Sequence, residues 1–406
     1  MPSFGTEFFA YALAIVTFHW NRCAMRLRVF FGVGAGLILA GSSTQGHAGY
    51  ENGFPTDPGF FPVGVWEQSP FRASQFKAIG VNTYVGLWEG PTEIQLSELA
   101  RAGMFAVAEQ NSVGLQSANR HVIKAWMQSD EPDNAQSIGM GLHGNCIPAT
   151  QVARRSREMK VLDSTRPVLI NFGQGVANEF WKGRGPCNGD QKYYDVAAED
   201  ADILSFDIYP VGSSTPQVKG KLEYVARGVT DLVGHAASGQ AIWAVLETTA
   251  LDPTIRPLRA QVRAEVWMAL THGAKGIVYF VHEFKPRLRE DAIFRYPDIV
   301  DEVTMINRQI RSLAPVLNAP NASRKVTVQS PVPIATMLKQ HEQALYLFAV
   351  AMRNAASRPQ FAIEGLDDTQ ADVLGELRSA SIRNGALEDD FAGYGVHLYK
   401  IPLPGR

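Results

Sequence analysis

Two glutamates stand at the ends of short apolar runs in this sequence, and each is followed by a turn. Glu131 closes the run Ala-Trp-Met-Gln-Ser-Asp-Glu, and Glu247 closes the run Ile-Trp-Ala-Val-Leu-Glu. Runs of this length that are mostly apolar are typical of buried strands. Two carboxylates at the ends of such strands can split a glycosidic bond, because one protonates the leaving oxygen and the other meets the sugar's developing positive charge. We therefore predict that Glu131 and Glu247 are a catalytic pair.

Further polar and aromatic residues fall at or just after predicted strand ends, where a substrate would bind. A sugar buries its apolar C–H face well against an aromatic ring. Core packing is the alternative for the aromatic residues, and Asp207 is the first substitute if one of the two glutamates is not catalytic. The residues predicted to bind or support the substrate are Asp130, Tyr209, Asp207, Trp66, Trp88, Asn111, Trp181, Tyr279, His282 and Glu283.

Each of the two glutamates also has a structural explanation. Acidic residues favour the start of a helix, so the Asp-Glu-Pro-Asp segment that contains Glu131 could cap the next helix. Glu247 could instead belong to a buried ion pair. The sequence contains no His-x-His strand end and no Gly-x-Ser-x-Gly motif. We therefore predict neither a metal site nor a serine nucleophile, and no cofactor.

These strand ends need a scaffold, and the periodicity of the sequence predicts one. Eight short apolar runs alternate with amphipathic helical patterns, which is typical of repeated βα units. The predicted fold is α/β, a (β/α)8 TIM barrel over residues 49–317, whose active site would lie at the carboxyl ends of the strands. No Gly-rich turn follows the first run, so a dinucleotide-binding sheet is not expected. The predicted strands are 61–66, 81–87, 105–108, 122–127, 168–171, 203–208, 242–246 and 276–281.

The C-terminal part has a different pattern. After a linker at 318–323, short β-rich runs follow one another without helical patterns between them. We predict a small antiparallel β-sandwich over residues 318–406, which either stabilises the barrel or binds carbohydrate. The runs are 325–328, 334–339, 344–352, 360–363 and 396–401.

The first 48 residues are predicted to be a secretory signal rather than part of the fold. Met25 starts a short basic segment, residues 29–40 are apolar, and small residues precede a cleavage site after Ala48. This pattern suggests that Met25 is the true start and that the mature protein is secreted or periplasmic. A membrane anchor is the alternative, but the apolar run is shorter than the roughly 20 residues that span a bilayer.

Composition limits the partners of the mature chain. The formal net charge of −2 over 406 residues gives no reason to expect nucleic acid or an anionic membrane as a partner. Cys146 and Cys187 lie in loop-like segments, and in an oxidising compartment such a pair either bridges or stays free.

Two further strand ends carry a family resemblance. Asp207-Ile-Tyr-Pro and Gly276-Ile-Val-Tyr-Phe resemble the sixth and eighth strand ends of the large clan of barrel glycoside hydrolases that carry the acid/base after strand four and the nucleophile at strand seven. The resemblance covers about residues 62–318. It implies that Glu131 is the acid/base and Glu247 the nucleophile of a retaining enzyme acting on a β-linked oligo- or polysaccharide. It also implies that Tyr209 donates to the nucleophile.

One position departs from the clan's pattern. Many members have asparagine before the acid/base, whereas this chain has Asp130, which can accept from a sugar hydroxyl but cannot donate to it. This difference bears on the substrate more than on the chemistry. A non-catalytic carbohydrate-binding barrel and a transglycosylase with the same residues are the alternative functions.

Overall fold

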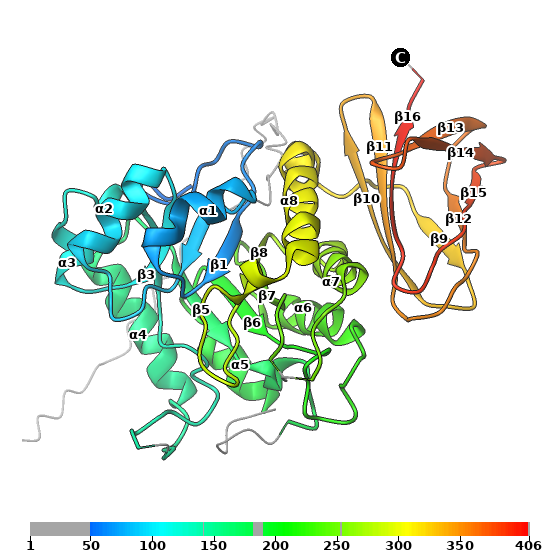
Figure 1. The fold of residues 1–406 in the computed structure, drawn as a ribbon. Helices are drawn as coiled ribbons and strands as arrows, with labels where there is room; N and C mark the ends of the chain where they lie inside the picture. The colour runs from blue at the N-terminus through cyan, green and yellow to red at the C-terminus, as the bar shows by residue number, and fades with distance from the viewer. Residues whose placement is uncertain (1–48, 141, 182–189, 252–253, 405–406) are drawn as a thin grey trace, which may run out of the picture. The chain divides into compact units, whose positions relative to one another are not determined.

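The computed structural model describes residues 49–140, 142–181, 190–251 and 254–404. The predicted secretory signal and Cys187 lie outside the described residues. Figure 1 shows a ring of strands enclosed by helices, followed in the chain by the strands of the C-terminal part, drawn in orange and red. No helix in the described ranges is both long enough and apolar enough to cross a membrane.

Eight parallel strands close into a barrel in chain order, with β8 pairing with β1. The prediction of a TIM barrel is confirmed, and each predicted apolar run contributes one strand. The strands are almost entirely buried, as expected for parallel strands that are covered on both faces. They are β1 (Val63–Trp66), β2 (Thr83–Val85), β3 (Phe105–Glu109), β4 (Ile123–Met127), β5 (Val168–Phe172), β6 (Ile203–Asp207), β7 (Ala241–Glu247) and β8 (Gly276–Phe280).

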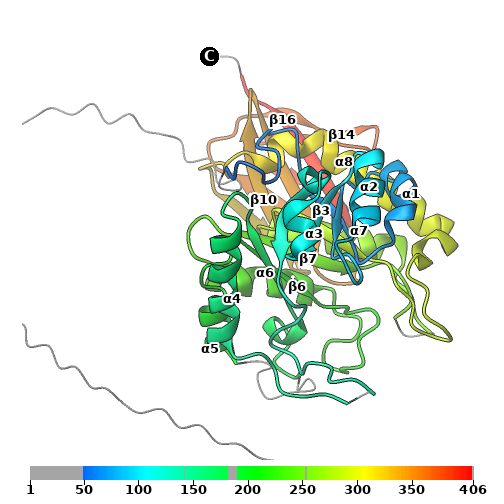
Figure 2. The same ribbon diagram turned by 90° about the vertical axis from the view of Figure 1, so that its left-hand side faces the viewer.

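Helices connect these strands and cover the outside of the barrel (Figures 1 and 2). The helices predicted from the sequence, at 70–78, 92–102, 150–162, 222–233, 257–271 and 297–313, include no counterpart of the two short helices α3 and α5. The α-helices are α1 (Ala73–Ala78), α2 (Glu93–Ala102), α3 (Ser112–Gln116), α4 (Ala149–Leu162), α5 (Gln191–Ala197), α6 (Glu223–His235), α7 (Arg259–Thr271) and α8 (Pro297–Asn318). Short 3-10 turns lie at η1 (Pro70–Arg72), η2 (Arg120–Val122), η3 (Gln174–Val176) and η4 (Ala292–Arg295).

Side chains fill the inside of the barrel. Alternate residues of a strand point to opposite faces, so Trp243 and Val245 pack inside with Val107 and Met127, while Ala244 and Leu246 pack outward in the core shared with the helices. The interior is therefore a packed core and not a pore. Substrate access is left to the carboxyl ends of the strands and the loops that follow them.

The C-terminal strands form one antiparallel sheet of eight strands, in the order β10-β11-β16-β13-β14-β15-β12-β9. The predicted antiparallel β-domain is confirmed, with its strands linked into one continuous ladder around a core of its own. Three strands, β13 to β15, have no counterpart among the predicted runs. The strands are β9 (Val326–Gln329), β10 (Ile334–His341), β11 (Ala344–Ala351), β12 (Gln360–Ile363), β13 (Thr369–Val373), β14 (Arg378–Arg383), β15 (Ala386–Glu388) and β16 (Val396–Pro402).

Candidate active site

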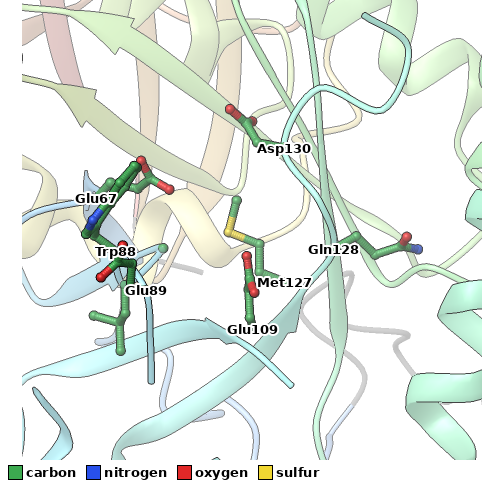
Figure 3. A pocket seen from close by; sticks show the side chains of 9 residues that line it. Glu67, Trp88, Glu89, Glu109, Met127, Gln128 and Asp130 are labelled. Carbon is green, nitrogen blue, oxygen red and sulfur yellow. The ribbon is translucent and has the colours of Figure 1, made fainter. Parts of the chain in front are cut away.

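An acidic pocket opens at the carboxyl ends of the first four barrel strands. Its cavity measures about 160 Å³. In Figure 3 the carboxylates of Glu67, Glu89, Glu109 and Asp130 surround one space, while the Gln128 side chain points away from it. None of the described lining residues is basic, so the pocket concentrates negative charge. The lining residues are Glu67, Gly86, Leu87, Trp88, Glu89, Glu109, Met127, Gln128 and Asp130.

Three residues after these strands have a strained backbone. Glu67, Glu89 and Glu131 have positive φ angles of 40°, 51° and 40°. A residue with a Cβ rarely adopts this region, and such strain clusters where a side chain must be held for function. Three of the nine non-glycine residues with positive φ among the described residues thus lie after β1, β2 and β4, and two of these three, Glu67 and Glu89, line the pocket.

The Asn171 amide, on β5, links the ends of β4 and β6. Its Nδ2 donates to Oδ1 of Asp130 at 2.9 Å and to Oδ1 of Asp207 at 3.2 Å. Its Oδ1 accepts a hydrogen bond from the Ser205 hydroxyl at 2.7 Å, which fixes the orientation of the amide. Since one amide nitrogen serves both acids, the carboxyl groups of Asp130 and Asp207 must lie close together.

Crowding of acids changes their proton affinity. Burial, followed by the charges of Glu131, Asp130 and Asp133, raises the pKa of Asp207 well above its usual value. Although much of Asp130 faces solvent, desolvation and the charge of Glu131 raise the pKa of its carboxyl to about 7. Burial, then the charges of Asp207 and Glu131, raises the pKa of Tyr209, whose hydroxyl lies within hydrogen-bonding reach of Asp207.

Glu131 is held by the segment around it. Its backbone N–H donates to the Asn171 carbonyl at 3.0 Å, and its Oε2 accepts from the Asn134 amide at 2.8 Å. A Cβ at position 173 would lie 2.9 Å from Oε1 of Glu131, so a side chain there would push the carboxylate from its place. Helix α4 begins at Ala149, many residues later, so the acidic segment does not cap it.

Glu247 lies in a different environment. Its side chain is 0 % exposed, and its two oxygens accept from the backbone N–H groups of Val211 at 2.6 Å and Gly212 at 3.1 Å. Burial raises the pKa of Glu247 to about 8, although the two N–H groups lower it. The charge of Glu131 raises the pKa of Asp207. The charge of Glu247 instead raises the pKa of Glu265, which lies in α7.

Among the predicted aromatic residues, Trp88 meets the expectation most clearly, since it lines the pocket and is 69 % exposed. Trp66 is buried among the residues inside the barrel. Tyr279 is buried and donates from its hydroxyl to Oδ1 of Asn307 in α8 at 2.7 Å. Trp181 is half-buried beside residues that the structure does not describe.

The remaining predicted polar residues are engaged elsewhere. Asn111 caps α3, accepting from the Gly114 N–H at 2.8 Å and donating to the Pro91 carbonyl at 2.9 Å. Glu283 is buried and bound by Arg295 at 2.6 Å and by the Tyr296 hydroxyl.

His282 is also buried, and desolvation lowers its pKa to about 4. The ring is therefore neutral at ordinary pH.

Glu67 and Asn171 are part of this site, and neither was singled out in the sequence. Glu67 was taken as part of the turn after the first strand, and Asn171 as the last residue of the fifth. Both are polar side chains at the end of an apolar run, which is the same signal that selected Glu131 and Glu247. Applying that signal to every strand would have found them.

The described residues also bear on the predictions about a metal site and a disulfide. Within the described ranges, no group of three or more His, Cys, Asp or Glu side chains could hold a metal ion. Cys146 is 7 % exposed and disulfide-bonded. Its predicted partner, Cys187, lies outside the described residues, so that pairing stays a prediction.

Comparison with solved structures finds the same architecture. A catalytic mutant of a β-galactosidase of glycoside hydrolase family 42 from G. stearothermophilus matches 85% of this chain and 98% of its own, at 7% identity and a TM-score of 0.51. This likeness establishes the fold. An α-L-arabinofuranosidase from Thermotoga maritima matches 85% of this chain and 97% of its own, at 12% identity and a TM-score of 0.48. A glucosidase from Croceicoccus marinus matches 88% and 98%, at 13% identity and a TM-score of 0.46.

No protein-family model matches the sequence, and comparison with curated proteins finds no match either.

Proposed function

We propose that this protein is a glycoside hydrolase whose chemistry is carried by Glu131 and Asp207. The observation that carries the proposal is the linked acid group, in which Asn171 bridges Asp130 and Asp207 and the charge of Glu131 raises the pKa of Asp207. Two carboxyl groups whose environments differ in this way are the usual means of separating a proton donor from its partner. Glu247 is 0 % exposed and has both carboxyl oxygens bound to backbone N–H groups, so we replace it with Asp207 as the second catalytic carboxyl; Asp207 then takes the acid/base role and Glu131 the nucleophile role.

The roles follow from the environments. Asp207 holds its proton and donates it to the glycosidic oxygen as the bond to the anomeric carbon breaks. Glu131, partly exposed and next in the chain to Asp130, which lines the pocket, attacks that carbon and forms a glycosyl ester. Asp207, now ionised, then removes a proton from water, which releases the sugar and restores both carboxyl groups. This is the double displacement of a retaining enzyme, with both catalytic groups on the β4 and β6 strand ends.

The pocket favours certain sugars. Four carboxylates with no described basic residue among the lining repel an anionic sugar and suit a neutral or cationic one. Trp88, largely exposed at the same pocket, offers a ring face for stacking. We infer a β-linked oligo- or polysaccharide from the resemblance of the strand-end motifs, and export of the enzyme from the leader sequence.

The test is reducing-end release by the mature protein, from Gly49 onward, on neutral, amino-sugar and uronic-acid polymers. Release from a neutral or cationic polymer that disappears in Glu131→Gln supports the proposal. Preferred cleavage of a uronic-acid polymer would contradict the inference about charge. Binding of a polymer without any release would favour the non-catalytic barrel, and transfer to a sugar acceptor without free reducing ends would favour the transglycosylase.

A further inference from the structure

Glu247, at the end of β7, holds the loop after β6 through two hydrogen bonds, and we call this arrangement the clamp. Its carboxylate, fully enclosed, accepts from two consecutive backbone N–H groups, those of Val211 and Gly212. A buried backbone N–H that loses its acceptor destabilises the fold, so two such groups that donate to one side chain fix the local course of the chain. The clamped segment directly follows β6.

That segment leads into the proposed site. Val211 stands two positions after Tyr209, whose hydroxyl lies within hydrogen-bonding reach of Asp207. The ring of Tyr209 packs on Phe280, with the ring centroids 5.0 Å apart. Phe280 is also the residue that pairs with Glu247 between β7 and β8. The main chain of Glu247 is thus fixed by β8, and its side chain fixes the segment that carries Tyr209.

The chain beyond Glu247 strengthens this anchorage. The hydroxyl of Thr248 donates to the Phe280 carbonyl at 2.8 Å, and the hydroxyl of Thr249 donates to the His282 carbonyl at 2.7 Å. Because the residues after Glu247 are tied to the end of β8, Glu247 has a rigid base from which to hold the neighbouring loop.

We propose that Glu247 is a positioning residue, which holds the segment after β6 so that Tyr209 keeps its contact with Asp207. The effect on turnover rests on the proposed function, while the clamp itself does not. Glu247 therefore influences catalysis through Tyr209 and Asp207 and does not attack the sugar.

Glu265 supplies a matched control. It is a second glutamate with 0 % exposure, and its pKa responds to the charge of Glu247. Neither of its oxygens has a hydrogen-bond partner among the described residues, so it clamps no loop. Glu265→Gln and Glu247→Gln remove the same group from equally buried positions.

Hydrogen exchange tests the clamp without any need for activity. Glutamine at position 247 offers one acceptor oxygen where two are used, so one of the two N–H groups loses its partner. We expect faster exchange at residues 209–213 in Glu247→Gln and unchanged exchange there in Glu265→Gln. Equal protection of that segment in both variants and in the wild type would overturn the clamp.

Kinetic measurements test whether Glu247 acts as a positioning residue. We expect Glu247→Gln to lower kcat about ten- to a hundredfold, since it leaves one buried donor unpaired. The alkaline limb of the pH–rate profile should also move to lower pH, because a looser Tyr209 admits water to Asp207. A loss of thermal stability with an unchanged pH profile would mean that the role is only structural.

Rescue by azide distinguishes a positioning role of Glu247 from a nucleophilic one. In Glu247→Ala, azide can enter the space of a lost nucleophile and attack the anomeric carbon as the leaving group departs, giving a glycosyl azide. We expect no such product and no recovery of rate. Recovery with formation of the azide would overturn the inference. A wild-type protein inactive on every substrate would reject the proposed function, and the exchange result would still decide the clamp.

Discussion

Replacing Glu265 should change the pH dependence of stability in a calculable way. The side chain is 0 % exposed in α7, and its carboxyl oxygens have no hydrogen-bond partner among the described residues. Burial, then the charge of Glu247, raises its pKa well above the ordinary value of 4.5. The folded protein therefore keeps a proton that the unfolded chain has lost.

The sign follows from this difference. Where the folded state binds the extra proton, the free energy of unfolding falls as pH rises, by about 1.4 kcal/mol per pH unit. The loss begins above the unfolded pKa and continues until the folded carboxyl ionises. Glu265→Gln and Glu265→Met both remove this contribution. Met should also be the more stable variant, because each unpartnered buried polar group costs about 1–3 kcal/mol.

The assay is urea unfolding followed by tryptophan fluorescence at about pH 5.5 and about pH 6.5, where the wild type should lose about 1.4 kcal/mol more than either variant. Glu364→Gln makes the same chemical change at an exposed position and should leave the pH dependence as in the wild type. Parallel pH dependence of the wild type and Glu265→Met would refute the reasoning, since it would mean that Glu265 is ionised in the folded protein.

Other outcomes concern catalysis, binding and stability. Asp207→Asn should slow substrates with poor leaving groups about 10²–10⁴-fold while sparing activated aryl glycosides, and Glu131→Gln should abolish both; the reverse pattern would exchange their roles. Trp88→Ala should raise KM about two- to tenfold without changing Tm, because stacking is worth about 0.5–1.5 kcal/mol and the ring is largely exposed; an unchanged KM would remove Trp88 from the binding site. Glu302→Gln should lower the free energy of unfolding by about 1–3 kcal/mol, measured by denaturant titration, because buried Glu302 binds Arg259 and Arg263 of α7; no loss would show that these ion pairs are neutral for stability.

The barrel could be predicted because its signal is local. A parallel strand covered on both faces must be apolar along its length, so all eight strands stand out from the sequence. Strand β14, Arg378–Arg383, was missed because small and polar residues make up most of it and only Ala380 and Ile382 are buried. Helices α3 and α5 have five and seven residues, too few for a helical repeat to be recognised.

The site was only partly predictable, because nearness to a strand end does not fix where a side chain points. Tyr279 satisfies the positional rule but faces α8, where its hydroxyl binds Asn307. Asn111 also satisfies it, yet its amide caps a short helix. Trp88 satisfies it and does line the pocket.

The amino-acid pattern was enough to show that buried strands end in acidic residues. Which of these acids meet depends on how the barrel closes. Closure of the barrel brings Asp130 and Asp207 to one amide of Asn171, whereas Glu247 finds two backbone N–H groups in the loop after β6. Periodicity depends on neighbours a few positions apart in the chain. The partner of a carboxylate depends instead on donors from distant segments, which come within reach only after the strands have closed.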